Sequence, residues 1–377
     1  MTKAAVLVAG VLLWAGWLGE STCSEGKVVA RFGFEASLPL GCFSLDPEAV
    51  LQITHEAGRV RQGSGALEFL YTPREGVLPG FILTGLKIPG ARSVEFWIRS
   101  SHYTGVAVIL AEKDGSRYVS YFLLGPGKWQ KVALSLDEFL LEEKSQDENW
   151  RLDPDQIRAM GILDLVVFKP LREVLKEEAT GTRYLGLDEV VFSTKEVPRS
   201  FSIRPVEGGK EVVVDCFENG LVQWLPVGLK CPRPEVKWVR EGAEGRGALR
   251  MDYSLEPKGA VALVKPLEGL PLKGAERVSL RIRVAQPSAI LIALEEQDGS
   301  NYQYMLKVLP EEGWKKVEAP LVQFKLAKDS TDENSKLDTD QLKLLILLDA
   351  SAFMGRTGPR TLWVDEVTFL CRSQGKP

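Results

Sequence analysis

The sequence is poor in histidine, with only His55 and His102 among its 377 residues. So few imidazoles leave little room for zinc sites or for histidine-based acid–base catalysis. The net charge is also small, at −4 from 47 basic and 51 acidic side chains. Because a nucleic-acid binder usually carries a strongly basic patch, we expect no nucleic-acid partner. The hydrophobic fraction of 45% argues against long intrinsic disorder.

Long apolar runs are confined to the N-terminus. After Lys3, residues 4–19 form an apolar run of about 16 residues, shorter than the roughly 20 that cross a bilayer. The run fits the core of a signal peptide, with cleavage after Ser21 or Cys23, so we predict that residues 1–23 are removed on export. No membrane span then remains.

A retained anchor and a lipidated Cys23 are alternatives, although the residues before Cys23 match a lipoprotein signal poorly. The predicted location is secreted, periplasmic or in the cell envelope.

Cysteine is scarce as well, with five in the chain. Export permits disulfides, and the four that follow Cys23 allow three pairings. Cys216 and Cys371 lie in the first and last predicted strands of the second half, which favours that pair. Free buried thiols are an equally open alternative for these four residues, which are Cys42, Cys216, Cys231 and Cys371.

The chain contains an internal repeat. Gly-Ser-Gly-Ala-Leu at 63–67 recurs as Gly-Arg-Gly-Ala-Leu at 245–249, an offset of 182 (245 − 63). Leu-Asp-Pro-Asp-Gln at 152–156 recurs as Leu-Asp-Thr-Asp-Gln at 337–341, an offset of 185 (337 − 152). The closing Leu-Asp-Glu-Val at 187–190 recurs as Val-Asp-Glu-Val at 364–367 with an offset of only 177 (364 − 187), so the first copy carries a helical or looped insertion near 168–183. We predict a first domain over 24–195, a linker over 196–210 and a second domain over 211–377.

Both copies have the pattern of β-strands. Val94, Phe96 and Ile98 alternate with polar or amphipathic residues, as in a strand with one buried face. Residues 106–111 are apolar on both faces, as in an inner strand, and Asp-Gly at 114–115 and 298–299 predicts hairpin turns. One short helix per copy is expected after Asp153 and Asp338. The fold class is all-β, with two tandem β-sandwich domains.

The ordered motifs of each copy resemble a known group of domains. They are Phe-Glu at 34–35 and 217–218, then Gly-x-Gly-Ala-Leu, Asp-Gly-Ser-x-Tyr, Leu-Asp-x-Asp-Gln and Asp-Glu-Val. The order is similar to that of galactose-binding-like jelly rolls, above all the family 11 carbohydrate-binding modules and the complex I intermediate-associated protein family. The resemblance covers nearly the whole mature chain and implies the jelly-roll fold. It identifies the ligand only weakly, because such folds carry many functions.

The resemblance also implies a structural calcium ion. An acidic residue of the first strand would meet one of the last, which pairs Glu35 with Asp188 and Glu218 with Asp365. Carboxylates and backbone carbonyls are the ligands that Ca²⁺ prefers. The alternative is that these acids cap strand ends or pair with Lys and Arg.

Aromatic rings that stack on sugar C–H faces are the expected sugar-binding groups of such modules. In the first copy the candidates are Trp97 and Tyr121, on a shared platform with Glu95 and Arg99 beside the tryptophan. Packing of Trp97 under a loop is the alternative. The second copy has Arg281 and Met305 at the same positions and a basic face, so it would prefer an acidic ligand or act as a spacer. Trp129 and Trp314 recur at strand starts and are predicted to be core residues.

Signs of catalysis are lacking in the motifs. The sequence has no Gly-x-Ser-x-Gly elbow, and neither histidine recurs in the other copy. The sequence therefore predicts an exported, non-catalytic protein that binds a poly- or oligosaccharide mainly through its first domain. The alternative is a structural or assembly protein of the cell envelope, whose sandwich domains contact envelope proteins.

Overall fold

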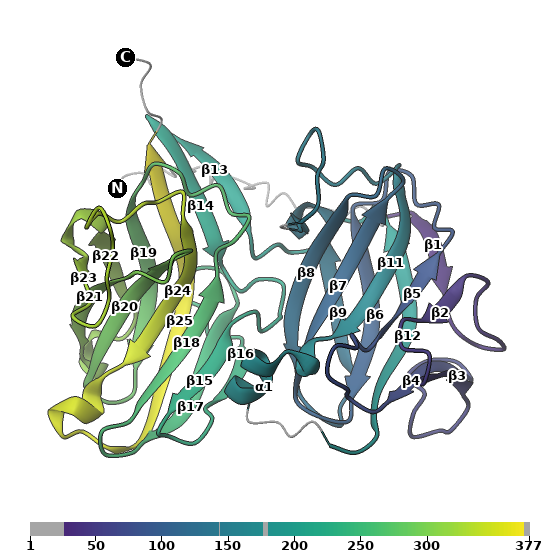
Figure 1. The fold of residues 1–377 in the computed structure, drawn as a ribbon, viewed down its shortest axis with the longest axis horizontal. Helices are drawn as coiled ribbons and strands as arrows, with labels where there is room; N and C mark the ends of the chain where they lie inside the picture. The colour runs from purple at the N-terminus through teal and green to yellow at the C-terminus, as the bar shows by residue number, and fades with distance from the viewer. Residues whose placement is uncertain (1–25, 143, 176–179, 373–377) are drawn as a thin grey trace, which may run out of the picture.

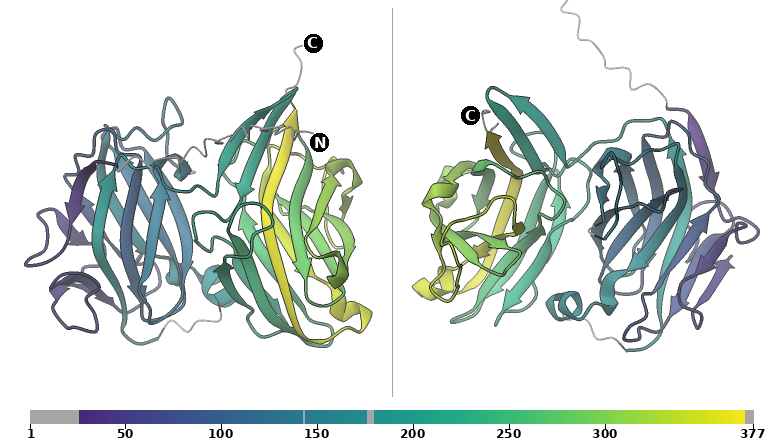
Figure 2. Two further views of the ribbon diagram at one scale, coloured as in Figure 1. Left: turned by 180° about the vertical axis from the view of Figure 1, so that it is seen from behind. Right: turned by 45° about the horizontal axis from the view of Figure 1, so that its top comes forward.

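The computed structural model describes residues 26–372 except 143 and 176–179. These residues form two β-sandwiches side by side (Figures 1 and 2). Each sandwich consists of two antiparallel sheets around its own hydrophobic core. The prediction of two tandem all-β, jelly-roll sandwich domains is confirmed. The predicted signal peptide, residues 1–23, lies outside the described residues, and within them no helix is long and apolar enough to cross a bilayer.

The first domain contains sheets A and B. Sheet A has the order β3-β4-β12-β6-β9, with β1 paired to β12. Its strands are β1 (Val28–Phe32), β3 (Val50–Thr54), β4 (Ala66–Tyr71), β6 (Ser93–Ser100), β9 (Gln130–Ser135) and β12 (Arg183–Ser193). Sheet B has the order β10-β8-β7-β11-β5-β2. Its strands are β2 (Cys42–Ser44), β5 (Gly80–Thr84), β7 (Thr104–Glu112), β8 (Arg117–Leu124), β10 (Leu140–Leu141) and β11 (Ile157–Asp164).

The second domain repeats this plan in sheets C and D. Sheet C has the order β13-β14-β25-β17-β16, and β19 joins β25 to β22. Its strands are β13 (Ser202–Val206), β14 (Gly209–Asp215), β16 (Glu235–Val239), β17 (Ala248–Leu255), β19 (Ala275–Val284), β22 (Lys315–Pro320) and β25 (Gly358–Arg372). Sheet D has the order β15-β18-β24-β20-β21-β23. Its strands are β15 (Leu225–Leu229), β18 (Ala260–Pro266), β20 (Ser288–Glu296), β21 (Asn301–Val308), β23 (Lys325–Leu326) and β24 (Leu342–Asp349).

The apolar periodicity explains which face of each strand is buried. In β6, Val94, Phe96 and Ile98 point into the core and are at most 1% exposed. The doubly apolar segment 106–111 lies in β7, an inner strand of sheet B, and the Asp-Gly turn connects β7 to β8 as predicted. β13 lies within the predicted linker, where it pairs with β14 and adds an outer strand to sheet C.

The helix content differs from the expectation. The short helices predicted after Asp153 and Asp338 are wrong. In each copy a single turn, closed by an i+3 hydrogen bond to the aspartate carbonyl, leads directly into a strand. One turn fixes several dihedral angles for one hydrogen bond, so it does not propagate into a helix without further residues. The insertion does contain a helix, α1 (Lys169–Leu175), after the 3₁₀ turn η2 (Leu165–Val167).

The favoured disulfide is absent, since Cys216 and Cys371 are both free thiols. In the β14–β25 ladder Cys371 lies opposite Lys210, six residues before Cys216. At about 3.3 Å per residue, the two thiols lie roughly 20 Å apart along the strands. The alternative of free thiols is therefore the correct one for this pair.

The two domains share an interface built from the loop before β15. Leu221 packs in the first domain's core. The Leu123 N–H donates to the Val222 carbonyl at 2.7 Å, and the Gln223 side chain donates to the Tyr121 carbonyl at 3.0 Å. In the same interface, α1 of the first domain packs on β15 of the second. One backbone hydrogen bond, one side-chain hydrogen bond and a buried leucine thus hold the second domain against the first.

Candidate ligand-binding face and acidic clusters

The outer face of sheet A carries three of the four predicted ligand-binding residues. Glu95, Trp97 and Arg99 alternate with the buried residues of β6 and are partly exposed on one face. Arg61 places its guanidinium 4.2 Å from the centroid of the Trp97 ring. This cation–π contact holds the indole in one orientation. Arg99 donates to the Gly58 carbonyl and so anchors the loop that carries Arg61.

A groove of about 550 Å³ lies along this face. Trp97 and Glu95 line it together with charged and polar residues of four other segments, which are Arg31, Glu35, Gln62, Lys131 and Glu189. Glu95 contacts Lys131 at 2.6 Å and Lys195 at 3.4 Å. Burial opposes ionisation of Glu95, but the two ammonium groups hold its pKa below the usual range. The groove therefore presents an aromatic ring beside fixed, ionised hydrogen-bonding groups.

Tyr121 does not belong to this face, so the predicted shared platform is wrong. Trp97 lies in β6 of sheet A, whereas Tyr121 lies in β8 of sheet B. Its ring points outward as predicted, but the second domain covers it. The Lys265 ammonium lies 5.8 Å from the centroid of the Tyr121 ring, and burial raises the pKa of the Tyr121 phenol well above its usual range. The aromatic residue at position 121 is therefore explained by its place in the interface between the two domains.

The corresponding face of the second domain is not basic. Arg281 replaces Trp97, as the repeat predicts, but Arg281 pairs with Glu244. Arg283 pairs with Glu241 at 2.5 Å, and Lys316 pairs with Glu318 at 2.8 Å. The partners come from the loop before β17 and from β22, so the prediction of a net basic face is wrong.

Trp129 and Trp314 are half-buried on the outer faces, so their prediction as core residues is wrong. Trp129 lies over Gly186, where a Cβ atom would come within 3.1 Å of the indole, so a larger residue there would push the ring outward slightly. In the second domain Trp363 replaces Gly186. Arg283 lies between the rings of Trp314 and Trp363, 5.2 and 4.1 Å from their centroids.

The predicted calcium residues mainly accept hydrogen bonds from one loop. The N–H groups of Arg61 and Gln62 donate to Asp188 Oδ2 at 2.9 Å, and the Ser64 hydroxyl donates to Glu35 Oε2 at 2.7 Å. The second domain repeats the arrangement with Glu218, Asp365 and the N–H groups of 243–247. A cation site needs oxygen atoms, so a loop that presents N–H donors does not fit calcium. These acids instead tie the loop to the strands through hydrogen bonds, which differs from the stated alternative of strand capping or pairing with Lys and Arg.

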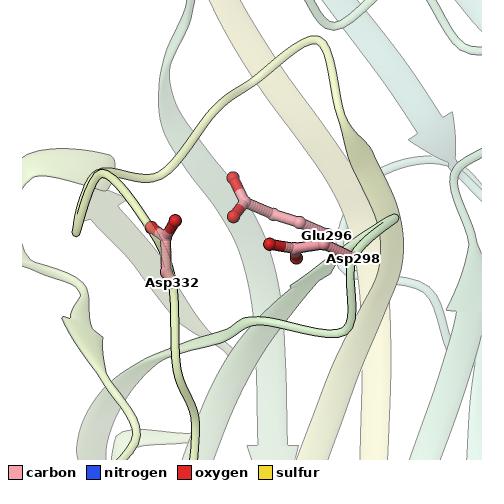
Figure 3. Close-up of side chains that lie close together, drawn as sticks. All are labelled: Glu296, Asp298 and Asp332. Atoms are coloured by element: carbon pink, nitrogen blue, oxygen red, sulfur yellow. The ribbon is translucent and has the colours of Figure 1, made fainter.

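A different acidic cluster could hold a metal ion. Carboxylate oxygens of Glu296, Asp298 and Asp332 lie within 4.8 Å of one another (Figure 3). Burial, and then the neighbouring carboxylates, raises the pKa of Glu296. The acidic run around Asp332 lacks the spacing of an EF-hand loop, so its sequence alone favours a solvated turn. The sequence could have revealed this cluster, because its three acids recur in the first copy as Glu112, Asp114 and Asp147. The offsets are 184, 184 and 185 (296 − 112, 298 − 114, 332 − 147).

No protein-family model matches the sequence, and no curated protein matches it. Among solved structures, the chain is similar to carbohydrate-binding modules. One is a family 11 module from Clostridium thermocellum in complex with a β-1,3-1,4-mixed-linked tetrasaccharide, with 18% identity, 42% of this chain and 94% of that chain covered, and a TM-score of 0.34. Another is the tandem pair of family 22 modules from Paenibacillus barcinonensis, with 13% identity, coverage of 92% and 98%, and a TM-score of 0.30. A family 29 module variant in complex with mannohexaose has 13% identity, coverage of 45% and 93%, and a TM-score of 0.28.

Proposed function

We propose that the protein is an exported, non-catalytic carbohydrate-binding protein whose first domain binds a poly- or oligosaccharide in the Trp97 groove. The observation that supports this proposal most is the groove itself, in which an indole ring lies beside the ionised Glu95 and Lys131. An aromatic ring stacks on the apolar face of a pyranose, and neighbouring charged groups hydrogen-bond its hydroxyls. Arg61 already covers one face of the ring and orients it, so the sugar would stack on the other face and little side-chain freedom would be lost on binding.

The proposal is tested by affinity electrophoresis of the purified protein through gels that contain soluble polysaccharides. We expect at least one β-glucan, xylan, mannan or other neutral polysaccharide to retard the protein relative to a non-binding reference protein. A mobility that no polysaccharide changes would contradict the proposal. Together with a co-purifying envelope protein, that result would favour a structural or assembly role in the cell envelope.

We also propose that calcium stabilises the second domain through Glu296, Asp298 and Asp332. The support for this placement is that three carboxylates converge here, against two at Glu35 and Asp188. The three also accept hydrogen bonds from Ser300, Tyr302 and the Asp338 N–H, some of which an ion would replace. An ion that binds only the folded state stabilises it by RT ln(1 + [L]/Kd), about 2.7 kcal/mol at 100 times Kd. We expect calcium to raise the Tm by several degrees over the value in chelator. The shift should be smaller in Asp332→Asn, and an identical Tm with calcium and with chelator would refute the proposal.

A further inference from the structure

Exposed apolar side chains gather at one edge of the first domain. Leu40 is fully exposed, and Phe43, Leu45 and Val50 are 39–49% exposed. These residues belong to β2, β3 and the loops around them. β2 is an edge strand of sheet B and β3 is an edge strand of sheet A, so unpaired strand edges and apolar side chains occur together here. Such edges are usually covered or carry charge, and this one suggests an interaction surface.

The same edge of the second domain is already used. β15 and the loop before it correspond to β2 and its loop, and this segment forms the contact with the first domain. Phe43 corresponds to Leu225, because Phe43 lies opposite Ile82 of β5 and Leu225 lies opposite Val264 of β18, the matching strand. Leu225 is half-buried and begins β15, the strand on which α1 of the first domain packs. Val50 corresponds to Glu235, because these residues lie opposite Leu70 and Asp252 in the matching strands β4 and β17. Just before Glu235, Arg233 donates to the Leu175 carbonyl at 2.5 Å and lies 4.3 Å from the Tyr103 ring centroid. In the second domain this edge therefore contacts the first domain, whereas the equivalent β2–β3 edge of the first domain is exposed.

The receiving surface has a partial free copy, because α1 belongs to the insertion that the first domain alone carries. In the first domain it comprises Tyr121 and Leu123 of β8 and the segment η2–α1. The second domain has Met305 and Lys307 at the β8 positions, and the 3₁₀ turn η5 (Ser351–Met354) where η2 stands. Met305 and Met354 are about half exposed, and Phe353 is 67% exposed. We define Met305, Lys307, Phe353 and Met354 as the β21–η5 face. Three of its residues are apolar, and Lys307 adds one positive charge.

We propose that the β2–β3 edge of one molecule docks on the β21–η5 face of a second copy, repeating the contact between the two domains of a single chain. β2 and β3 lie at the outer end of the first domain, and β21 lies at the outer end of the second (Figure 1). One molecule thus presents both surfaces at opposite ends, so the contact is heterologous and leads to chains or closed rings.

The test is sedimentation velocity of the purified chain over about a 100-fold range of concentration. We expect the average mass to rise with concentration. Phe43→Glu blocks only the edge and Phe353→Glu blocks only the face, so each variant alone should stay monomeric. Mixed in equal amounts, each variant supplies the intact surface that the other lacks, and the mixture should form dimers but no larger species.

Ile203→Glu is the matched control, because Ile203 is also half exposed but lies in β13, away from both surfaces. It should associate like the wild-type chain. A wild-type protein that stays monomeric throughout would overturn the proposal. So would a mixture of the two variants that contains only monomers, or a Phe353→Glu variant that associates like the wild type. Unchanged circular dichroism spectra exclude misfolding as the cause.

Discussion

Replacing Trp97 with alanine is expected to abolish retardation by every polysaccharide that slows the wild-type protein. The substitution removes the ring on which a sugar would stack and leaves Arg61 without its aromatic partner. Loss of the stacked area and of the aromatic contact together amounts to about 2 kcal/mol or more, or at least roughly 30-fold in affinity. Affinity electrophoresis at several polysaccharide concentrations measures the dissociation constant of each variant.

Two controls distinguish loss of a binding site from general damage. Trp314→Ala removes a partly buried tryptophan of similar setting from the second domain, where Arg283 stacks on it, and should retain the wild-type affinity. Tyr121→Ala removes the covered aromatic residue of sheet B and should also keep the retardation. Full binding by Trp97→Ala, or equal loss in Trp97→Ala and Trp314→Ala, would contradict a site in the first domain.

Replacing Glu138 with glutamine is expected to make the protein more stable at alkaline pH. Glu138 lies in the 3₁₀ turn η1 (Leu136–Glu138), where Oε1 accepts hydrogen bonds from the N–H groups of Ser200 and Phe201. Oε2 is buried and has no hydrogen-bond partner among the described residues. Burial raises the pKa of the Glu138 carboxyl from 4.5 to about 7, although both N–H donors favour ionisation. Asp215 opposes ionisation as well, and Lys265, which pairs with Asp215 at 3.3 Å, favours it.

The direction of the pH effect follows from this raised pKa. The folded protein keeps the Glu138 proton up to about pH 7, whereas an unfolded chain releases it near 4.5. The resulting stabilisation is complete below 4.5 and is lost as the pH rises through about 7. A neutral glutamine has no such loss, and the second copy has Gln323 at this position. Near pH 8.5 we expect Glu138→Gln to exceed the wild type by up to about 3 kcal/mol in free energy of unfolding.

Urea unfolding at pH 5 and pH 8.5 measures the difference. At pH 5 the two proteins should differ little, because Glu138 is mostly protonated there. The exposed Glu311→Gln is the control and should follow the wild type at both values. An equal or lower stability of Glu138→Gln at pH 8.5 would show that Glu138 is ionised at no cost in the folded protein.

Local patterns predicted much of the fold and part of the site. The alternation in β6 correctly placed Trp97, Glu95 and Arg99 on an outward face, because a strand has a period of two. The repeat predicted two domains of the same plan. The position of Tyr121 could not be predicted, because the sheet that a strand joins depends on pairings distant in sequence. The charge balance of the second domain was missed for a similar reason, since Glu241 and Glu244 reach Arg283 and Arg281 from a separate loop.

The most direct test of the central proposal is an NMR titration that follows the indole N–H resonances with fragments of a retarding polysaccharide. Comparison with Trp97→Phe assigns the Trp97 signal among the seven tryptophans that follow residue 23. We predict that the Trp97 signal shifts on sugar binding, while the signals of Trp314 and Trp363 stay in place. Saturable shifts at those two residues with no change at Trp97 would contradict the site.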